Sequence, residues 1–448
     1  MAADCTVYSV SWNLTQRCNL VCAHCYMSAF PGADTRGELS TEECRRVIGE
    51  IGAINPNVLL ILTGGEPFLR KDLFDVAAYA ADARFTVVFG TNGLLLREGE
   101  ARRMREAGVL GASLSLDSTD RERHDRFRHR PGAWDGALRA TRVLRAEGLD
   151  FSLHMSVTDW NLGEIPAMID LARELGAKVL NFFFLVRTGR GADLTDISPE
   201  EYERVLTYLA KVQAVGPLGP GGAPDPPGAR GFEDPWSAPV GRAGDLLIRA
   251  KCAPHFRRII WELDPTSRLL GNYAHGACPA GKQYCRITPE GDVTACPYLP
   301  VSAGNLRRAS FADIWRAAPV LEELRQGRLG GRCGACEFSK ICGGCRCRAY
   351  ATSGDYLAED PACAYQPGAH GGQPIELPPS LTWGLEVRHE IAWDEAARAR
   401  LGAVPSFARG MVVKAVEAYA RGRGQAVVTA EVLAQVRAQW GARFRPRP

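Results

Sequence analysis

The sequence predicts an α/β fold built on a parallel sheet or barrel, followed by a cysteine-rich region. From about residue 8 to residue 186, short β-rich runs alternate with amphipathic helical stretches, and repeated β-α units of this kind form parallel sheets. The chain has 448 residues, too many for one ordinary core, so we expect two or three domains. Twelve of its 15 cysteines fall into two groups, three near the start and nine between Cys278 and Cys363.

Six strands are expected in the first part of the chain. The first covers residues 8–14, and the other five are apolar runs at residues 58–62, 85–89, 111–115, 151–157 and 178–186. Helical patterns between them cover residues 41–54, 72–83, 133–147 and 163–175. Ligands of such folds bind at the carboxyl ends of the strands, so the cysteine group after the first strand lies at the binding face.

Composition excludes several classes of protein and partner. The formal net charge of +3 is too small to indicate nucleic-acid binding. No run of 18 apolar residues exists, so we expect no membrane span. The first five residues lack the features of a secretion signal. Without such a signal, 15 cysteines fit metal ligation in a reducing cytoplasm better than a disulfide framework.

The first cysteine group has the spacing C-x3-C-x2-C, at Cys18, Cys22 and Cys25. Three thiolates so close together can hold three corners of a four-iron cube and leave the fourth iron open to a ligand. The alternative is a loop of free or disulfide-bonded thiols. The tight spacing and the many later cysteines favour the cluster.

A second motif, Gly64-Gly65-Glu66-Pro67, follows the second strand. Its glycines let the backbone approach a ligand closely, and its glutamate offers a carboxylate to an ammonium group. Thr91-Asn92 follows the third strand, and the segment from Ser115 to Asp117 follows the fourth.

Together these motifs resemble the radical SAM superfamily over about the first 190 residues. The resemblance implies a partial (βα)6 barrel that binds S-adenosyl-L-methionine (SAM) and a catalytic [4Fe-4S] cluster on the three cysteines. His24 takes a position usually held by an aromatic residue. The cluster, reduced by a low-potential donor such as ferredoxin or flavodoxin, would cleave SAM to a radical that abstracts hydrogen from the substrate. The implied SAM contacts are His24, Gly64, Gly65, Glu66, Pro67, Thr91, Asn92, Ser115 and Asp117.

The later cysteines resemble the SPASM extension of that superfamily, which implies one or two auxiliary [4Fe-4S] clusters. The resemblance assigns one cluster to Cys278, Cys285, Cys296 and Cys345. It assigns the other to Cys333, Cys336, Cys342 and Cys363, and Cys347 remains an alternative to Cys345. Zinc is the competing interpretation, because C-x2-C pairs also bind zinc.

Several stretches, among them Cys252-Ala-Pro-His255 and 342–349, resemble the heme-modifying branch and, within it, the heme b synthases. This implies oxidative decarboxylation of two propionates of Fe-coproporphyrin III to vinyl groups. The related deacetylase and d1-heme enzymes more often carry Asn at the position of Cys345. Basic side chains would hold the propionates, and a thiol or imidazole would approach the heme iron. The candidates are Arg187, Arg190, Arg257, Arg258, Cys252 and His255.

We expect five segments along the chain. These are the barrel (1–215), a Pro/Gly-rich loop (216–250), an α+β SPASM-type extension (251–365), a linker (366–385) and a small all-helical domain (386–448). The last resembles the C-terminal domain of light-independent protochlorophyllide reductase, which acts on a tetrapyrrole. Two other hypotheses remain: a peptide-modifying SPASM enzyme, and a non-enzymatic scaffold that delivers metal or heme.

Overall fold

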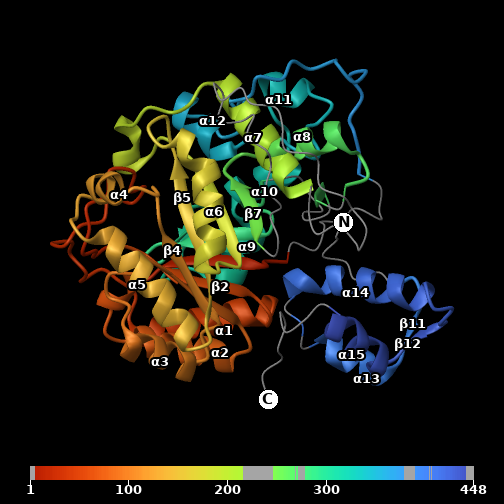
Figure 1. The fold of residues 1–448 in the computed structure, drawn as a ribbon, viewed down its shortest axis with the longest axis horizontal. Helices are drawn as coiled ribbons and strands as arrows, with labels where there is room; N and C mark the ends of the chain where they lie inside the picture. The colour runs from red at the N-terminus through yellow and green to blue at the C-terminus, as the bar shows by residue number, and fades with distance from the viewer. Residues whose placement is uncertain are drawn as a thin grey trace.

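A ten-stranded sheet forms the centre of the protein (Figure 1). The computed structural model describes residues 6–214, 246–267, 269–270, 278–377, 389–402, 404 and 406–439. The strand order is β10-β9-β8-β1-β2-β3-β4-β5-β6-β7. The strands are β1 (Ser9–Asn13), β2 (Leu59–Thr63), β3 (Thr86–Thr91), β4 (Gly111–Ser115), β5 (Asp150–Val157), β6 (Val179–Phe184), β7 (Leu247–Lys251), β8 (Tyr284–Ile287), β9 (Asp292–Cys296) and β10 (Leu299–Asn305).

The six predicted strands are confirmed as β1 to β6, which run parallel to one another. A seventh parallel strand, β7, pairs with β6 and uses residues predicted to end the Pro/Gly-rich loop. On the other side β8 runs parallel to β1, and β9 and β10 follow antiparallel. Neither β10 nor β7 has a second strand partner in the described part of the chain, so the sheet stays open as a partial barrel.

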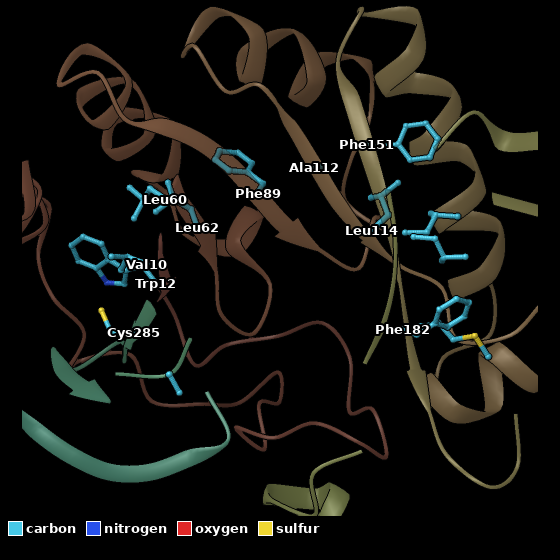
Figure 2. Packing of buried hydrophobic residues seen from close by; sticks show 14 of the residues in the cluster. Val10, Trp12, Leu60, Leu62, Phe89, Ala112, Leu114, Phe151, Phe182 and Cys285 are labelled. Carbon is cyan, nitrogen blue, oxygen red and sulfur yellow. The ribbon is translucent and has the colours of Figure 1, made fainter. Parts of the chain in front are cut away.

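Helices pack against one face of this sheet and enclose the apolar core (Figure 2). Val10, Trp12 and Leu114 are among the strand residues that have no exposed surface. The predicted helices are confirmed, and α1 begins with a capping box between Ser40 and Glu43. The helices of the barrel are α1 (Thr41–Ile54), α2 (Leu73–Asp82), α3 (Glu98–Glu106), α4 (Arg121–Arg128), α5 (Ala133–Ala146), α6 (Ile165–Leu175) and α7 (Pro199–Ala214), with short 3-10 turns η1 (Pro67–Leu69), η2 (Leu162–Glu164) and η3 (Gly189–Asp193).

Strand residues that alternate with this core point to the opposite side, which we call the inner face. Successive side chains of a strand lie on opposite faces, and residues paired in register share a face. The inner face carries polar side chains together with apolar ones such as Ile61 and Val88, and most of them keep some exposure while their outer neighbours are buried. Its polar members include Ser11, Asn13, Ser113, Ser115, Ser152, His154, Asn181, Lys251 and Arg286.

The cysteine-rich extension packs around β8, β9 and β10. Its helices are α8 (His255–Leu263), α9 (Phe311–Ala317), α10 (Pro319–Gln326), α11 (Gly331–Ala335) and α12 (Arg346–Ser353). Part of the predicted linker belongs to this unit, because the backbone N–H groups of Gly368 and His370 donate to the buried carboxylate of Glu337. The predicted loop residues 216–245 and linker residues 378–385 lie outside the described residues.

The C-terminal unit has an apolar core of its own. It contains α13 (Glu395–Gly402), α14 (Ser406–Arg421) and α15 (Ala430–Gln439). It also contains a two-stranded parallel sheet of β11 (Ala392–Trp393) and β12 (Val427–Val428), which the sequence analysis did not predict. None of the helices in the described ranges is long and apolar enough to cross a membrane.

Candidate iron-sulfur and SAM site

The three cysteines of the first group lie on the loop that follows β1. Cys18 and Cys22 are buried and Cys25 is half-buried, and together with Leu20 and Ala29 they form a small cluster of their own. The 14 cysteines in the described ranges are all free thiols. This excludes the disulfide interpretation for Cys18, Cys22 and Cys25.

Two arginines from distant segments hold this loop. Arg190, in η3 after β6, donates to the carbonyl oxygens of Cys22 and Ala29, each at 2.9 Å. Arg128, at the end of α4, points a guanidinium nitrogen at the Cys22 sulfur, 3.7 Å away. Positive charge beside a thiolate stabilises it, so these residues suit a loop whose sulfurs ligate iron. Sequence reasoning missed Arg128 and gave Arg190 a different role.

Burial raises the pKa of the Cys18 thiol to about 12, so this side chain is protonated when no metal holds it. Thiolates are the metal-ligating form, and metal binding displaces their protons. The donor set therefore fits the implied cluster: three thiols on one loop, shielded from water, with a cationic neighbour.

The Gly64-Gly65-Glu66 turn packs directly against the cysteine loop, and only glycine allows this. The N–H of Gly65 donates to the Thr15 carbonyl at 2.7 Å, and that of Glu66 donates to the Arg17 carbonyl at 2.9 Å. A Cβ atom on Gly65 would lie 2.2 Å from the Arg17 oxygen, and one on Gly64 would lie 2.5 Å from the Thr15 oxygen. The close approach expected from the sequence is therefore made to the protein's own cysteine loop.

Glu66 is fully buried, and its carboxylate links the turn to the next strand end. It accepts from the Thr91 hydroxyl at 2.8 Å and from the Asn92 N–H at 3.0 Å. Asn92 in turn donates to the side chain of Asn19, beside Cys18, at 2.7 Å. Burial raises the pKa of Glu66 to about 7, although these hydrogen bonds oppose the shift. Its described contacts are internal, so the carboxylate also orients the segments around the predicted SAM site.

The fourth strand end adds a buried ion pair. Asp117 accepts from Arg128 at 2.6 Å and from the N–H of Ser156 at 2.9 Å. Burial alone would raise the pKa of Asp117, but the Arg128 charge lowers this pKa to about 2. His24 stacks on Phe127, with ring centres 4.5 Å apart. Asp117 thus acts through Arg128 on the Cys22 thiol, a connection that sequence spacing does not reveal.

In the extension, the structure brings together four of the predicted auxiliary ligands. Cys333, Cys336, Cys342 and Cys363 line one cavity, together with His255, Arg258 and Asp360. Within the described ranges, no three His, Cys, Asp or Glu side chains are close enough to hold a single metal ion. A four-iron cube holds its thiolates further apart than one zinc ion does. The cavity therefore fits the cluster better than zinc.

A second group of thiols surrounds the start of α12. Cys345 is the N-cap of this helix, and its hydrogen bond with Cys347 lowers the pKa of Cys345 to about 6. Cys347 also forms a hydrogen bond with Cys296, at the end of β9. Burial and the nearby thiols of Cys345 and Cys296 raise the pKa of Cys278 to about 11, and the same causes raise that of Cys252.

Cys285 does not join this group, contrary to the prediction. Its partner in register is Val10 of β1, and its side chain is fully buried in the apolar core (Figure 2). Burial raises the pKa of its thiol, and the charged neighbour that opposes this shift is Arg325. Cysteine spacing alone did not reveal which face of β8 this residue occupies.

Cys252, which the prediction did not include among the auxiliary ligands, lies close to Cys345, Cys296 and Cys278. It follows β7 with a φ of +59°, a left-handed conformation that a non-glycine residue adopts only when its surroundings hold it there. Its carbonyl oxygen accepts from Arg348 of α12 at 3.0 Å. Arg348 also donates to Asp360 at 3.2 Å, and Asp360 accepts from the N–H of Cys345 at 2.6 Å. These contacts join Cys252 to the start of α12.

The arginines proposed to bind propionates are largely engaged inside the protein. Arg258 pairs with Glu203 and Glu262, and Arg190 holds the cysteine loop. Arg187 is exposed and donates to the Ala192 carbonyl at 2.8 Å. Arg257, the fourth arginine, is buried in α8. The candidate iron ligand His255 is also buried, and its Nε2 lies 3.2 Å from the Asp360 carboxylate.

Comparison with known proteins agrees with these sites. Residues 12–172 match the radical SAM superfamily, and residues 278–345 match an iron-sulfur cluster-binding domain. An AdoMet-dependent heme synthase of Methanosarcina barkeri is 38% identical over 367 residues, which cover 80% of this chain and 97% of that protein. The chain belongs to the radical SAM superfamily. SAM and [4Fe-4S] clusters are the cofactors of this enzyme family.

Three further similarities refine the position of this radical SAM protein. An Fe-coproporphyrin III synthase of the same archaeon is 31% identical, over 79% of this chain and 87% of that protein. The SAM-bound structure of Streptococcus suis SuiB shares the fold, with a TM-score of 0.61 and 16% identity over 81% of this chain and 78% of that one. Residues 393–437 match the proto-chlorophyllide reductase 57 kD subunit, as the tail resemblance predicted.

Proposed function

We propose that this radical SAM protein decarboxylates two propionates of Fe-coproporphyrin III to vinyl groups and so forms heme b. The observation that carries the proposal is the 38% identity with an AdoMet-dependent heme synthase along 97% of that protein's length. The cysteine loop and the Gly64–Pro67 turn lie within the radical SAM match, and the thiols from Cys278 to Cys345 lie within the iron-sulfur match.

The geometry suits an oxidation that both starts and ends with one-electron transfer. Each propionate loses one hydrogen atom and carbon dioxide, and one electron must leave the substrate. When bound, SAM and the clusters supply the hydrogen abstraction and these electron transfers. The chain places Tyr26, next to Cys25, in edge contact with Tyr298, two residues after Cys296, with ring centres 5.2 Å apart. These rings join the loop of the first cluster to the extension and offer an apolar surface on which a flat macrocycle can pack.

We assign the auxiliary ligands from the two thiol groups. One cluster uses Cys333, Cys336, Cys342 and Cys363, which share a cavity. The other uses Cys252, Cys278, Cys296 and Cys345. Cys347 is not a ligand in this assignment and forms hydrogen bonds with Cys296 and Cys345. Arg128 and Arg190 hold the loop of the first cluster in shape. A ferredoxin or flavodoxin serves as the low-potential electron donor.

The second candidate function is that of the Fe-coproporphyrin III synthase relative, which is 31% identical. The lower identity and the cysteine at position 345 favour the heme synthase. The peptide-modifying hypothesis receives less support, because the mycofactocin maturase MftC of Mycobacterium ulcerans is 30% identical, against 38% for the heme synthase, and the likeness to SuiB is one of fold at 16% identity.

The test is incubation of anaerobically reconstituted protein with Fe-coproporphyrin III, SAM and a reductant, followed by mass spectrometry of the porphyrin. We expect a product that has lost two carboxyl groups and two hydrogen atoms, and none with a Cys22→Ala variant. Cleavage of SAM with the porphyrin unchanged would reject the heme synthase assignment while leaving the superfamily assignment intact.

A further inference from the structure

Two cationic side chains on the inner face have no carboxylate partner among the described residues. Arg286 of β8 lies opposite Ser11 of β1, its Nε donates to the side-chain oxygen of Asn13, and its guanidinium lies 5.5 Å from the Tyr26 ring centre. Lys251 ends β7 and pairs in register with Phe183 of β6. Both are half-buried, so ligands can reach them from the inner face.

In the described part of the chain, no carboxylate forms an ion pair with Lys251, and its neighbours Phe183 and His154 on the inner face are uncharged. His154 of β5 packs against Phe183 with ring centres 4.9 Å apart, and Ser152 lies 3.3 Å from the His154 ring. Burial and the nearby Lys251 ammonium lower the pKa of His154 to about 3, so this imidazole is neutral.

The acidic groups nearest the strand ends are already bound elsewhere. Asp117 pairs with Arg128, and the Glu66 carboxylate accepts from Thr91 and Asn92. Besides serine, asparagine and histidine, the inner-face strand positions hold one carboxylate, Asp150 at the start of β5, and a third cation, Arg249 of β7. Both of these side chains are exposed, whereas Arg286 and Lys251 are half-buried. This face therefore carries unneutralised positive charge in a partly desolvated place, which an anionic ligand would offset.

One cation stands beside the first cysteine loop, and the other stands beside the second group of thiols in the extension. The Tyr26 ring under Arg286 follows Cys25 in the chain, and Lys251 directly precedes Cys252. In the sheet, β8 and β7 lie on opposite sides of the run from β1 to β6. The two charges nevertheless lie around one point, because the Tyr26 ring under Arg286 contacts Tyr298, and Cys252, next to Lys251, lies near that same Tyr298.

We infer that Arg286 and Lys251 bind the propionate carboxylates of a tetrapyrrole that lies on the inner face. The guanidinium offers a carboxylate a two-point fork, whereas the ammonium provides a point charge on a flexible stem. This inference rests on the proposed function for its ligand. It replaces Arg187, Arg190, Arg257 and Arg258 as the carboxylate-binding residues.

The test measures porphyrin binding without turnover. Fe-coproporphyrin III is titrated into reconstituted protein, with neither SAM nor reductant, and the porphyrin absorption band reports binding. Because each substitution removes a charge-assisted bond, Arg286→Gln and Lys251→Gln should each weaken binding by about ten- to a hundredfold. Arg286→Lys, which keeps the charge, should recover part of this loss. Iron content and the circular dichroism spectrum check that each variant is folded.

The matched control is Arg173→Gln on α6, whose guanidinium pairs with Asp170 at 2.8 Å on the helical side of the sheet. It should bind the porphyrin like the parent. A second arm uses the porphyrin with its propionates esterified: the parent should bind the ester weakly, the preference for the acid should shrink in Arg286→Gln, and it should disappear when Lys251→Gln is added. Parent-like binding of the acid by both glutamine variants would overturn the inference, as would equal losses for acid and ester.

A failure of the proposed function gives a different result. If the parent does not bind Fe-coproporphyrin III but binds heme through the heme carboxylates, the proposed substrate is wrong. The same variants then test the two cations on heme, with the same expected losses. If the parent binds no carboxylated porphyrin at all, both proposals fall.

Discussion

Arg190 donates a hydrogen bond to the carbonyl oxygen of Cys22 at 2.9 Å, although the two residues are 168 positions apart. Its second guanidinium nitrogen donates to Ala29 at the same distance, and its backbone N–H donates to Cys25 at 3.1 Å. The segment that follows β6 therefore fixes the loop that follows β1. The first cluster site is held across the whole width of the parallel strands.

Arg190→Gln should loosen that loop, because two carbonyl oxygens lose a charged donor. Such bonds are worth about 1.5–3 kcal/mol each. We expect SAM cleavage to fall about tenfold and a chelator to remove iron faster from the first cluster, measured in reduced protein without porphyrin. Arg36→Gln is the control, since that exposed side chain pairs with Asp34 at 2.7 Å. Equal behaviour of the two variants would contradict the positioning role.

Gly65→Ala should prevent assembly of the first cluster. The added Cβ would lie 2.2 Å from the Arg17 oxygen and 3.0 Å from the Cys18 Cβ, so the cysteine loop must shift. We expect iron content to drop by about four atoms per chain, with the auxiliary clusters retained. Gly163→Ala is the matched control, because no atom lies within 4 Å of its added Cβ. A Gly65→Ala protein with full iron and normal SAM cleavage would refute this account.

The barrel and the first site could be read from the sequence because their signals are local. Apolar runs marked β1 to β6, and the motif around Cys18 and the Gly64–Pro67 turn each directly follow a strand. Local patterns, however, do not report long-range contacts. The hydrogen bond between Arg190 and Cys22 and the charge of Arg128 beside that thiol appear only after folding.

The extension was harder to predict for a different reason. Counting cysteines identified two groups of auxiliary thiols, but whether a given cysteine belongs to a group depends on which face of its strand it occupies. Cys285 lies on the core side of β8, and Cys252 joins from β7, a strand hidden at the edge of a Pro/Gly-rich stretch. The same missed strands, β7 and β8, carry Lys251 and Arg286 on the inner face.

Cys252→Ala and Cys285→Ala should separate the two ligand assignments. We expect the parent to hold roughly twelve irons in three clusters. Cys252→Ala should lose about four of them, together with one auxiliary signal in the electron paramagnetic resonance spectrum of the reduced protein. Cys285→Ala should keep all of them, because its thiol lies among apolar core side chains. Iron loss in Cys285→Ala but not in Cys252→Ala would restore the assignment made from sequence.

Glu417→Ala should destabilise the C-terminal unit without affecting the iron sites. Glu417 is buried in α14 and accepts from the Trp393 indole at 2.8 Å and from the Glu390 N–H at 3.0 Å. Removing it leaves these donors without their acceptor, at a cost of about 1–3 kcal/mol each. We expect Trp393 to become accessible to a fluorescence quencher at lower denaturant concentration than in the parent. Iron content and SAM cleavage should be unchanged, because this unit has an apolar core of its own. Loss of iron in this variant would instead show that the C-terminal unit supports the cluster domains.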